Sequence, residues 1–297
     1  MLQAEYDTGK LTTFKIGGKI KEVYFPASVE EFCASEFNDV KVFGNLSNTL
    51  VSSYGYSGAV VLTSKMDEIR IEDTKIYADC GVKGPVLAQQ AAKLGLSGLE
   101  FMAGFPGSVG GEVYMNASAN GQSVSSVIVN IILYSKDRGA FTLKKSEMEF
   151  GYRSSVCQRG GYAVLGAEFE LERRPAEEIK AKMQENLAFR KSRQPGLALP
   201  NAGSVFRNPQ GDFAGRLLED AGVKGLKYGG AKVWENHSNF ILNENQASST
   251  DVLELMLLMY NRVKEKSGIE LEPEIVFLGG NNAREIEIWE TLTKTQK

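Results

Sequence analysis

The chain of 297 residues contains only one histidine, His237, and only three cysteines. A single histidine excludes metal sites built from several histidines, and a Ser-His-Asp triad could form only around His237. The cysteines, Cys33, Cys80 and Cys157, lie far apart and form no Cys-x-x-Cys motif. We therefore expect reduced thiols, no disulfide framework and no metal site.

Long apolar runs and a strong excess of charge are also missing. No segment approaches the roughly 20 apolar residues needed to cross a bilayer, and the first residues lack the basic and apolar regions of a secretion signal. The formal net charge is -3, with 42% hydrophobic and 24% charged residues. This composition predicts a globular, cytoplasmic protein with neither a nucleic acid nor a membrane as partner. The oligomeric state is left open, with a monomer as the expectation.

The length predicts two or three packed units. The first part alternates short apolar strands with glycine-rich turns, and we expect strands at residues 23–25, 40–43, 60–63, 75–78, 127–134 and 162–171. One helix interrupts them, beginning at Pro85 and ending at Gly95, with Leu87, Ala91 and Leu94 on one face. Strands with few helices indicate an α+β fold.

The composition changes after Pro175. We expect a helix that begins with acidic residues and ends with basic residues before Pro195. Ile179, Met183 and Leu187 form one face of it. Further helices are expected at residues 213–221 and 251–266, and strands at 239–243 and 275–278. Asp251 and Glu254 have capping-box spacing. This part predicts a second, smaller α/β unit.

Two glycine-rich segments, residues 42–51 and 103–121, could hold phosphate oxygens through bare backbone N–H groups. The alternatives are a loop that needs positive φ angles for residues 103–121, and ordinary turn chemistry for residues 42–51. The residues alone do not decide between these interpretations. The Rossmann, Walker and nucleophile-elbow patterns all fail, so a phosphate-bearing ligand would need a less common scheme.

Seven motifs in register resemble those of the UDP-N-acetylenolpyruvoylglucosamine reductases. They begin at residues 11–18, 44–51 and 103–121 and continue at 152–155, 201–209 and 229–231, and residues 271–275 with Gly279 complete the pattern. The resemblance implies a two-subdomain FAD-binding fold of the vanillyl-alcohol-oxidase (PCMH) type over residues 1–66 and 67–174. A substrate-binding domain is implied over residues 175–297. Since His237 lies outside the cofactor subdomains, we expect FAD to be held noncovalently.

The resemblance assigns cofactor contacts to two loops. The implied FAD-binding residues are Gly44, Asn45, Ser47, Asn48, Gly104, Pro106, Gly107, Ser108, Gly110, Gly111, Asn116, Ser118, Ala119 and Gly121. The implied contacts to the substrate are Tyr152, Arg207 and Asn208, the last two at the UDP diphosphate.

The implied reaction is the reduction of UDP-N-acetylenolpyruvoylglucosamine to UDP-N-acetylmuramate, a precursor of peptidoglycan, with NADPH as hydride donor. Arg153 would clamp the substrate carboxylate, because a guanidinium binds a carboxylate through two parallel hydrogen bonds. Ser204 would protonate the enolate, and Glu274, with a raised pKa, would polarise it. Taken singly, these residues are better explained as a surface arginine, a turn serine and a solvated glutamate.

The chain departs from the family pattern at several positions. They are Leu46, Ser118, Asn120, Cys157, Arg207, Trp234 and Asn236. All three catalytic positions are intact, so these departures bear on affinity more than on activity. The short length resembles the class without an inserted tyrosine loop over the substrate. Two rival interpretations remain, namely another FAD oxidase or dehydrogenase acting on a small alcohol, and a noncatalytic flavin or nucleotide-binding module.

Overall fold

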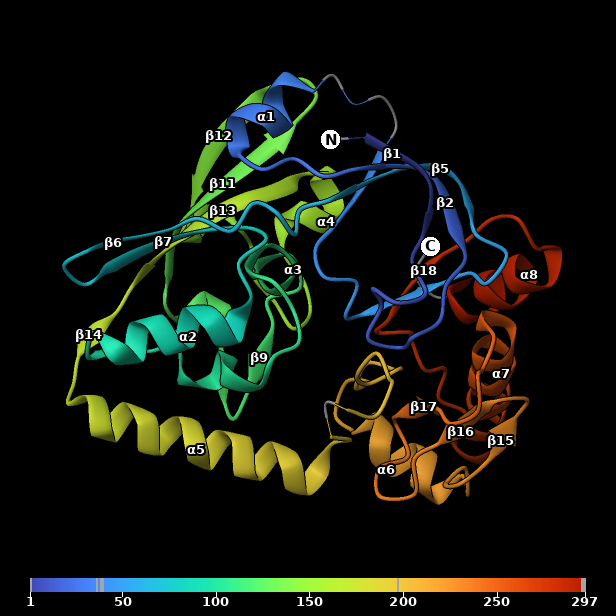
Figure 1. The fold of residues 1–297 in the computed structure, drawn as a ribbon. Helices are drawn as coiled ribbons and strands as arrows, with labels where there is room; N and C mark the ends of the chain where they lie inside the picture. Colours follow the sequence, from blue (N-terminus) through green and yellow to red (C-terminus); the bar gives the residue numbers. More distant parts are fainter. Residues whose placement is uncertain (1, 36, 38–39, 197, 295–297) are drawn as a thin grey trace. The chain divides into compact units, whose positions relative to one another are not determined.

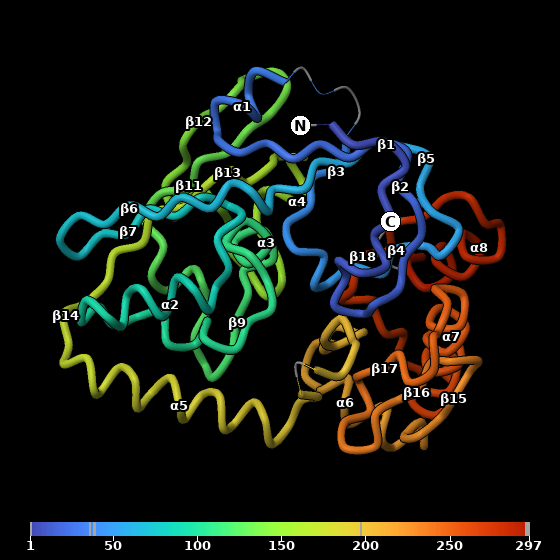
Figure 2. The backbone as a smooth tube through the Cα atoms, viewed as in Figure 1, coloured from blue at the N-terminus to red at the C-terminus, as the bar shows by residue number. Residues whose placement is uncertain are grey.

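The computed structural model describes residues 2–35, 37, 40–196 and 198–294 (Figures 1 and 2). They form two compact units between which the chain passes four times. The first unit contains Tyr24–Asn45 and Val60–Arg190, and the second contains Leu2–Val23, Leu46–Ala59 and Lys191–Lys297. The predicted boundaries at residues 66 and 174 rest on composition and resemblance, and they stay a prediction.

The first unit is built on an antiparallel sheet of order β12-β11-β13-β7-β6. Its strands are β6 (Ile69–Glu72), β7 (Lys75–Asp79), β11 (Ile128–Ser135), β12 (Gly139–Lys144) and β13 (Ala163–Glu170). One apolar cluster joins this sheet to α2 (Gly84–Lys93) and α3 (Val109–Tyr114). A smaller cluster joins it to α1 (Val29–Ala34) and β3 (Val40–Phe43). The sheet is therefore buried on both faces.

Short elements complete the first unit. They are β8 (Leu96–Ser97), η1 (Glu100–Gly104), β9 (Ser118–Ala119), β10 (Gln122–Ser123), η2 (Val124–Ser126), η3 (Lys145–Glu147), α4 (Val156–Gly160) and β14 (Glu172–Arg173). The long helix α5 (Ala176–Arg193) begins in this unit and ends in the second.

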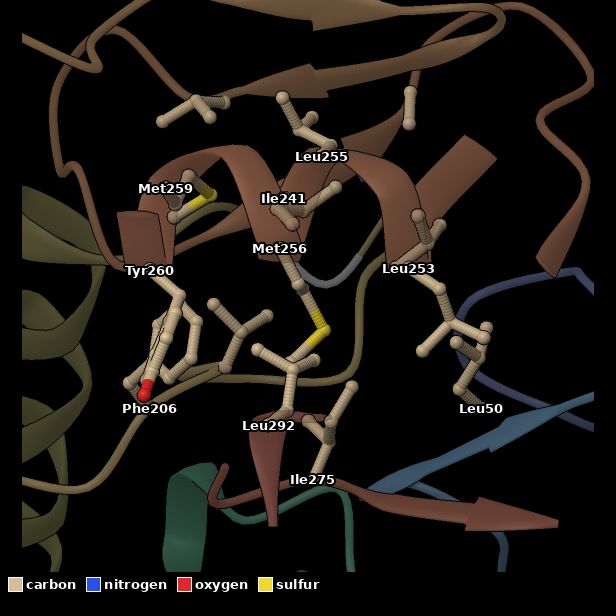
Figure 3. Packing of buried hydrophobic residues seen from close by; sticks show 14 of the residues in the cluster. Leu50, Phe206, Ile241, Leu253, Leu255, Met256, Met259, Tyr260, Ile275 and Leu292 are labelled. Carbon is tan, nitrogen blue, oxygen red and sulfur yellow. The ribbon is translucent and has the colours of Figure 1, made fainter. Parts of the chain in front are cut away.

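The second unit packs around α7 (Ser249–Ser267), whose buried face carries Leu253, Met256 and Met259 (Figure 3). Around it lie α6 (Ala214–Asp220), α8 (Ala283–Leu292) and a sheet of order β15-β16-β17 (Lys227–Tyr228, Ala231–Val233, Ile241–Asn243). β4 (Thr49–Val51) pairs in parallel with β18 (Val276–Leu278). The strands β1 (Leu2–Asp7), β2 (Lys19–Tyr24) and β5 (Tyr56–Leu62) are hydrogen-bonded neighbours in that order.

The α+β class is confirmed, and the expected helices α2, α5, α6 and α7 are present with shifts of one or two residues at their ends. The expected capping box is wrong. Ser248 is the N-cap of α7, and its hydroxyl accepts the N–H of Asp251 while the Asp251 carboxylate accepts the N–H of Ser248. Asp251 is thus the third helical residue rather than the cap, because the more upstream serine supplies the hydroxyl.

Two expected apolar faces are only partly buried. On α2 Leu94 is 50% exposed, and on α5 Leu187 is 41% exposed while Ile179 is buried. All three cysteines are free thiols. In the described part of the chain no cluster of side chains suits a metal ion, and no helix is long and apolar enough to span a membrane.

Candidate functional site

The segment rich in glycine folds as a short 3-10 helix, a loop and the start of a helix. η1 ends at Gly104, and α3 begins at Val109 with Ser108 as its N-cap. We call residues 104–111 the glycine loop. None of its glycines has a positive φ angle, whereas Gly121 has a φ of 78°. The alternative of a left-handed backbone therefore explains Gly121 and fails for the glycine loop.

Close packing explains some of the glycines but not all of them. A Cβ atom would lie 2.8 Å from the Cβ of Cys80 at Gly110, and 2.7 Å from the Cδ of Arg190 at Gly104. At Gly111 the nearest atom to such a Cβ would be 4.0 Å away. The fold therefore leaves room for a side chain at Gly111, so its absence there is consistent with the close approach of a ligand to the backbone.

The two glycine-rich segments meet within the first unit. The Asn45 amide donates a hydrogen bond to the carbonyl oxygen of Gly107 at 3.3 Å. A Cβ at Gly44 would lie 2.1 Å from the Oγ of Ser108, a contact that no side chain could keep. Gly44 thus allows β3 to end directly against the glycine loop.

The Ser108 hydroxyl and the glycine backbone beside it fit the phosphate groups of a cofactor such as FAD. Ser108 is 1% exposed, and its Oγ has no hydrogen-bond partner within the described chain. A buried hydroxyl without a partner is unfavourable, and a phosphate oxygen would accept its hydrogen bond. Together with the bare backbone at Gly44 and Gly111, it makes a surface suited to a group with several oxygen acceptors.

Arg153 occupies a tight turn close to the second half of the glycine-rich segment. Gly151 and Ser154 pair across this turn, and Arg153 has a φ of 52°, which is uncommon for a residue with a side chain. Its Nη1 donates to the Oγ of Ser118 at 3.0 Å, and the amide of Asn116 donates to the carbonyl of Gly151 at 2.9 Å. Asn116 and Ser118, both expected at the cofactor, therefore also hold the arginine in place.

The neighbours of this turn are well defined. The guanidinium carbon of Arg153 lies 5.3 Å from the ring centre of Tyr152, which is 54% exposed. Ser118 and Ala119 form β9, which pairs with β10 through a turn at Asn120 and Gly121, with φ of 53° and 78°. Positive φ at both central residues is typical of a tight hairpin turn, and Asn and Gly tolerate it best.

Ser204 and Glu274 lie on adjacent segments of the second unit. Glu274 donates its backbone N–H to the carbonyl of Val205 at 2.8 Å, and Ser204 pairs with Phe240 on its other side. Gly203, with a φ of 82°, supplies the turn before the serine. The structure therefore brings these two predicted catalytic residues together from stretches far apart in the sequence.

Asn48 fixes the backbone beside Glu274. Its amide donates to the carbonyl oxygen of Glu274 at 2.9 Å, and its own carbonyl accepts the N–H of Val276 at 2.9 Å. The carbonyl of Ser47 accepts a hydrogen bond from the Thr13 hydroxyl at 3.1 Å. Asn48 thus holds the backbone of the segment that carries Glu274.

Arg207 and Asn208 follow Ser204 in the same unit. The backbone N–H of Arg207 bonds to the carbonyl of Glu272 at 2.8 Å, and its Nε is buried without a partner in the described chain. Asn208 accepts the N–H of Ala214 at 3.0 Å and so holds the start of α6. Arg153 belongs to the first unit while Ser204 and Glu274 belong to the second, so their convergence on one ligand stays a prediction.

Two side chains beside the glycine loop are not among the residues predicted from the sequence. Glu112 is 4% exposed, and burial alone raises its pKa to about 8. Arg190 lies over Gly104, and burial lowers the pKa of its guanidinium. A glutamate within a run of glycine and valine was a signal of burial that the sequence did contain.

His237 lies in the second unit, as expected. Burial lowers its pKa, and its Nδ1 accepts the N–H of Asn239 at 3.2 Å. The ring is therefore neutral near pH 7 with its proton on Nε2, which suits a structural role.

Comparisons with known proteins show the domains and the family of the chain. Residues 27–136 match an FAD binding domain, and residues 194–278 match the C-terminal domain of UDP-N-acetylenolpyruvoylglucosamine reductase. The reductase of Caldicellulosiruptor bescii is 41% identical over 278 residues, covering 91% of this chain and 88% of the relative. That of Caldanaerobacter subterraneus is 41% identical over 274 residues, covering 90% of each. The crystal structure of the enzyme from Thermus caldophilus matches with a TM-score of 0.81 at 34% identity, over 94% of this chain and 100% of the other.

The fold and the loop that fits phosphate define an FAD-containing oxidoreductase. The identity over nine-tenths of the chain defines it further. The chain belongs to the UDP-N-acetylenolpyruvoylglucosamine reductase family.

Proposed function

We propose that this chain reduces UDP-N-acetylenolpyruvoylglucosamine to UDP-N-acetylmuramate in the cytoplasm, with NADPH as the hydride donor. The product would serve peptidoglycan synthesis. The observation that carries the proposal is the 2.8 Å hydrogen bond from Glu274 to the residue after Ser204. It supports a single site in which a hydroxyl and a carboxyl group act on the same substrate.

FAD is held without a covalent bond in this proposal. Ser108 donates its hydroxyl to a phosphate oxygen, and the backbone at Gly44 and Gly111 supplies N–H groups that no side chain covers. The support is the buried, unpartnered Oγ of Ser108 together with the open space at Gly111. When bound there, FAD would supply the hydride chemistry that links NADPH to the methylene carbon of the enolpyruvyl group.

Ser204 provides the proton that completes the reduction. Addition of hydride to the methylene carbon leaves an electron pair on the neighbouring carbon and its carboxylate. Transfer of the Ser204 hydroxyl proton to that carbon forms the lactyl ether, and solvent then returns a proton to the serine. A hydroxyl is a weak acid, but an enolate of a carboxylate is basic enough to take its proton.

Glu274 and Arg153 stabilise the charge that develops on the substrate carboxylate. A protonated Glu274 donates a hydrogen bond to it, and Arg153 binds it through two parallel hydrogen bonds. Arg153 is already oriented by Ser118 at 3.0 Å, which lowers the entropy lost when substrate binds. Tyr152 supports the guanidinium through its ring.

The nucleotide part of the substrate binds beside Ser204. Arg207 offers a buried Nε without a partner in the described residues, and the substrate diphosphate would satisfy it. Asn208 contacts the same diphosphate through its amide nitrogen, since its oxygen already accepts the N–H of Ala214 at 3.0 Å.

Absorbance spectra at the flavin bands test this function. The purified protein should be yellow, NADPH should bleach it without oxygen, and the enolpyruvyl nucleotide should restore the colour. Bleaching without recovery would remove the assigned substrate, and a colourless or unbleachable protein would favour a noncatalytic module.

The Ser204→Ala variant separates the proposal from a different FAD oxidase. It should still bleach with NADPH, while recovery on addition of the enolpyruvyl nucleotide should slow by about 10²- to 10⁴-fold, the usual contribution of a positioned proton donor. An unchanged rate of recovery would exclude Ser204 as the proton donor. The Ser238→Ala variant, at a buried serine of the same unit, serves as the matched control.

A further inference from the structure

Unpartnered buried polar atoms concentrate under the glycine loop. Five such side-chain atoms occur in the described chain, and three of them are the Oγ of Ser108 and both carboxyl oxygens of Glu112. The two residues stand one helical turn apart, and the Glu112 N–H bonds to the Ser108 carbonyl at 2.9 Å. Ser108 has a role in the proposed function, whereas Glu112 has none.

The Glu112 carboxyl group fills the space between the glycine loop and the start of α2. A Cβ atom at Gly84 would lie 2.4 Å from its Oε1, and one at Gly107 would lie 3.2 Å from the same oxygen. The backbones of these two glycines are joined by a 3.4 Å hydrogen bond from the Gly84 N–H to the Gly107 carbonyl. The carboxyl group is therefore packed against the part of the loop that the proposed cofactor contacts.

An ionised carboxylate is unstable in this position. Neither oxygen receives a hydrogen bond from the described residues, and a buried charge without partners is strongly unfavourable. Burial raises the Glu112 pKa to about 8, and no charged group contributes to the shift. The carboxyl group is thus protonated at neutral pH, and its ionisation would drive it toward water through the packed loop.

The surrounding titratable groups do not offset that charge. They are Lys83 before α2, Asp79 and Cys80 at the end of β7, and Tyr114 at the end of α3. Lys83 is exposed, and burial raises the Cys80 pKa to about 12, so this thiol stays neutral through the range in which Glu112 ionises. Burial also raises the pKa of Asp79.

We propose that Glu112 is a positioning residue that keeps the glycine loop in its FAD-binding form only while its carboxyl group is protonated, so that loss of this proton releases the cofactor. The inference rests on the proposed contact between FAD and this loop. Only protein with a protonated Glu112 binds FAD. The apparent dissociation constant of FAD is therefore inversely proportional to the protonated fraction.

The test is the dissociation constant of FAD for the apoprotein between pH 6.5 and 9, measured by quenching of flavin fluorescence. Wild-type protein should bind FAD about tenfold more weakly at pH 9 than at pH 7. The Glu112→Gln variant keeps the shape of the side chain without an ionisable proton, and its dissociation constant should stay constant. A purely structural role would instead weaken binding equally at every pH.

The Glu100→Gln variant is the matched control. Glu100 is 6% exposed, but its carboxylate accepts hydrogen bonds from Ser97 Oγ at 2.6 Å and the Gly98 N–H at 2.9 Å. This variant should keep the wild-type pH profile. A wild-type dissociation constant that is flat to pH 9, with circular dichroism showing folded protein, overturns this inference alone. Failure of all proteins to bind FAD at any pH overturns the proposed function as well.

Discussion

Replacement of Glu112 by glutamine should change the pH dependence of stability in the apoprotein. Burial raises the pKa of this carboxyl group from its ordinary value of 4.5 to about 8. Below pH 4.5 both folded and unfolded chains are protonated, so the group adds no pH dependence. Between pH 4.5 and 8 the unfolded chain is ionised while the folded chain keeps its proton, so the stability of the wild-type protein falls as pH rises.

The size of the effect follows from the shift. One pKa unit corresponds to about 1.4 kcal/mol, so ionisation of the unfolded state disfavours folding by about 3 kcal/mol at pH 7 and about 5 kcal/mol above pH 8. The glutamine variant lacks this loss. Its buried N–H groups without partners cost about 1 to 3 kcal/mol, but this amount does not vary with pH.

Urea unfolding of flavin-free protein at pH 5.5, 7 and 8.5 measures the difference. The free energy of unfolding of Glu112→Gln, relative to wild type, should rise by about 1.4 kcal/mol per pH unit up to pH 8 and then level off. The Glu100→Gln variant should not reproduce this profile, because two hydrogen-bond donors already solvate that carboxylate. A difference between Glu112→Gln and wild type that is constant across pH would refute the argument for a buried, neutral carboxyl group.

Four further variants test the site. Gly111→Ala should keep the stability of the apoprotein, because the space beside it is open, and should weaken FAD binding. Gly110→Ala should destabilise the fold by about 1 to 3 kcal/mol, because its Cβ would overpack the core. Equal stability of the two variants in thermal unfolding would contradict the packing argument. Asn48→Ala removes the 2.9 Å hydrogen bond to the Glu274 carbonyl, so it should lower turnover of the enolpyruvyl nucleotide and reduce stability by about 1 kcal/mol. Arg153→Lys should lower kcat/KM for that substrate at least about tenfold, since a lysine cannot bind a carboxylate through two hydrogen bonds; an unchanged value would remove the proposed clamp.

The sequence predicted the elements whose signals are local. α2 ends at Lys93, just before Gly95 with its φ of 66°, and β3 spans the predicted residues 40–43. The motif order led to the family, which the relatives and the family models confirm. The resemblance therefore indicated which residues to examine before any packing was known.

Other features depend on contacts between distant residues, which local patterns do not encode. Gly110 packs against Cys80 and Gly104 packs against Arg190, whereas Gly111 faces open space. The sequence shows only a run of glycines, so it cannot tell these two roles apart. The parallel pairing of β4 with β18 likewise joins two short strands with no common signal. Leu50 of β4 is buried in the core of the second unit, so β4 is held there by packing that its own sequence does not show.

The four passages of the chain between the units set an order for its biosynthesis. A ribosome that has translated the first 190 residues has already released Leu2–Val23 and Leu46–Ala59, but the helices and strands that complete their unit are not yet synthesised. Nascent β4 has no partner until Val276 emerges. Early segments of the second unit must therefore wait, exposed to solvent or to chaperones, until translation is nearly finished.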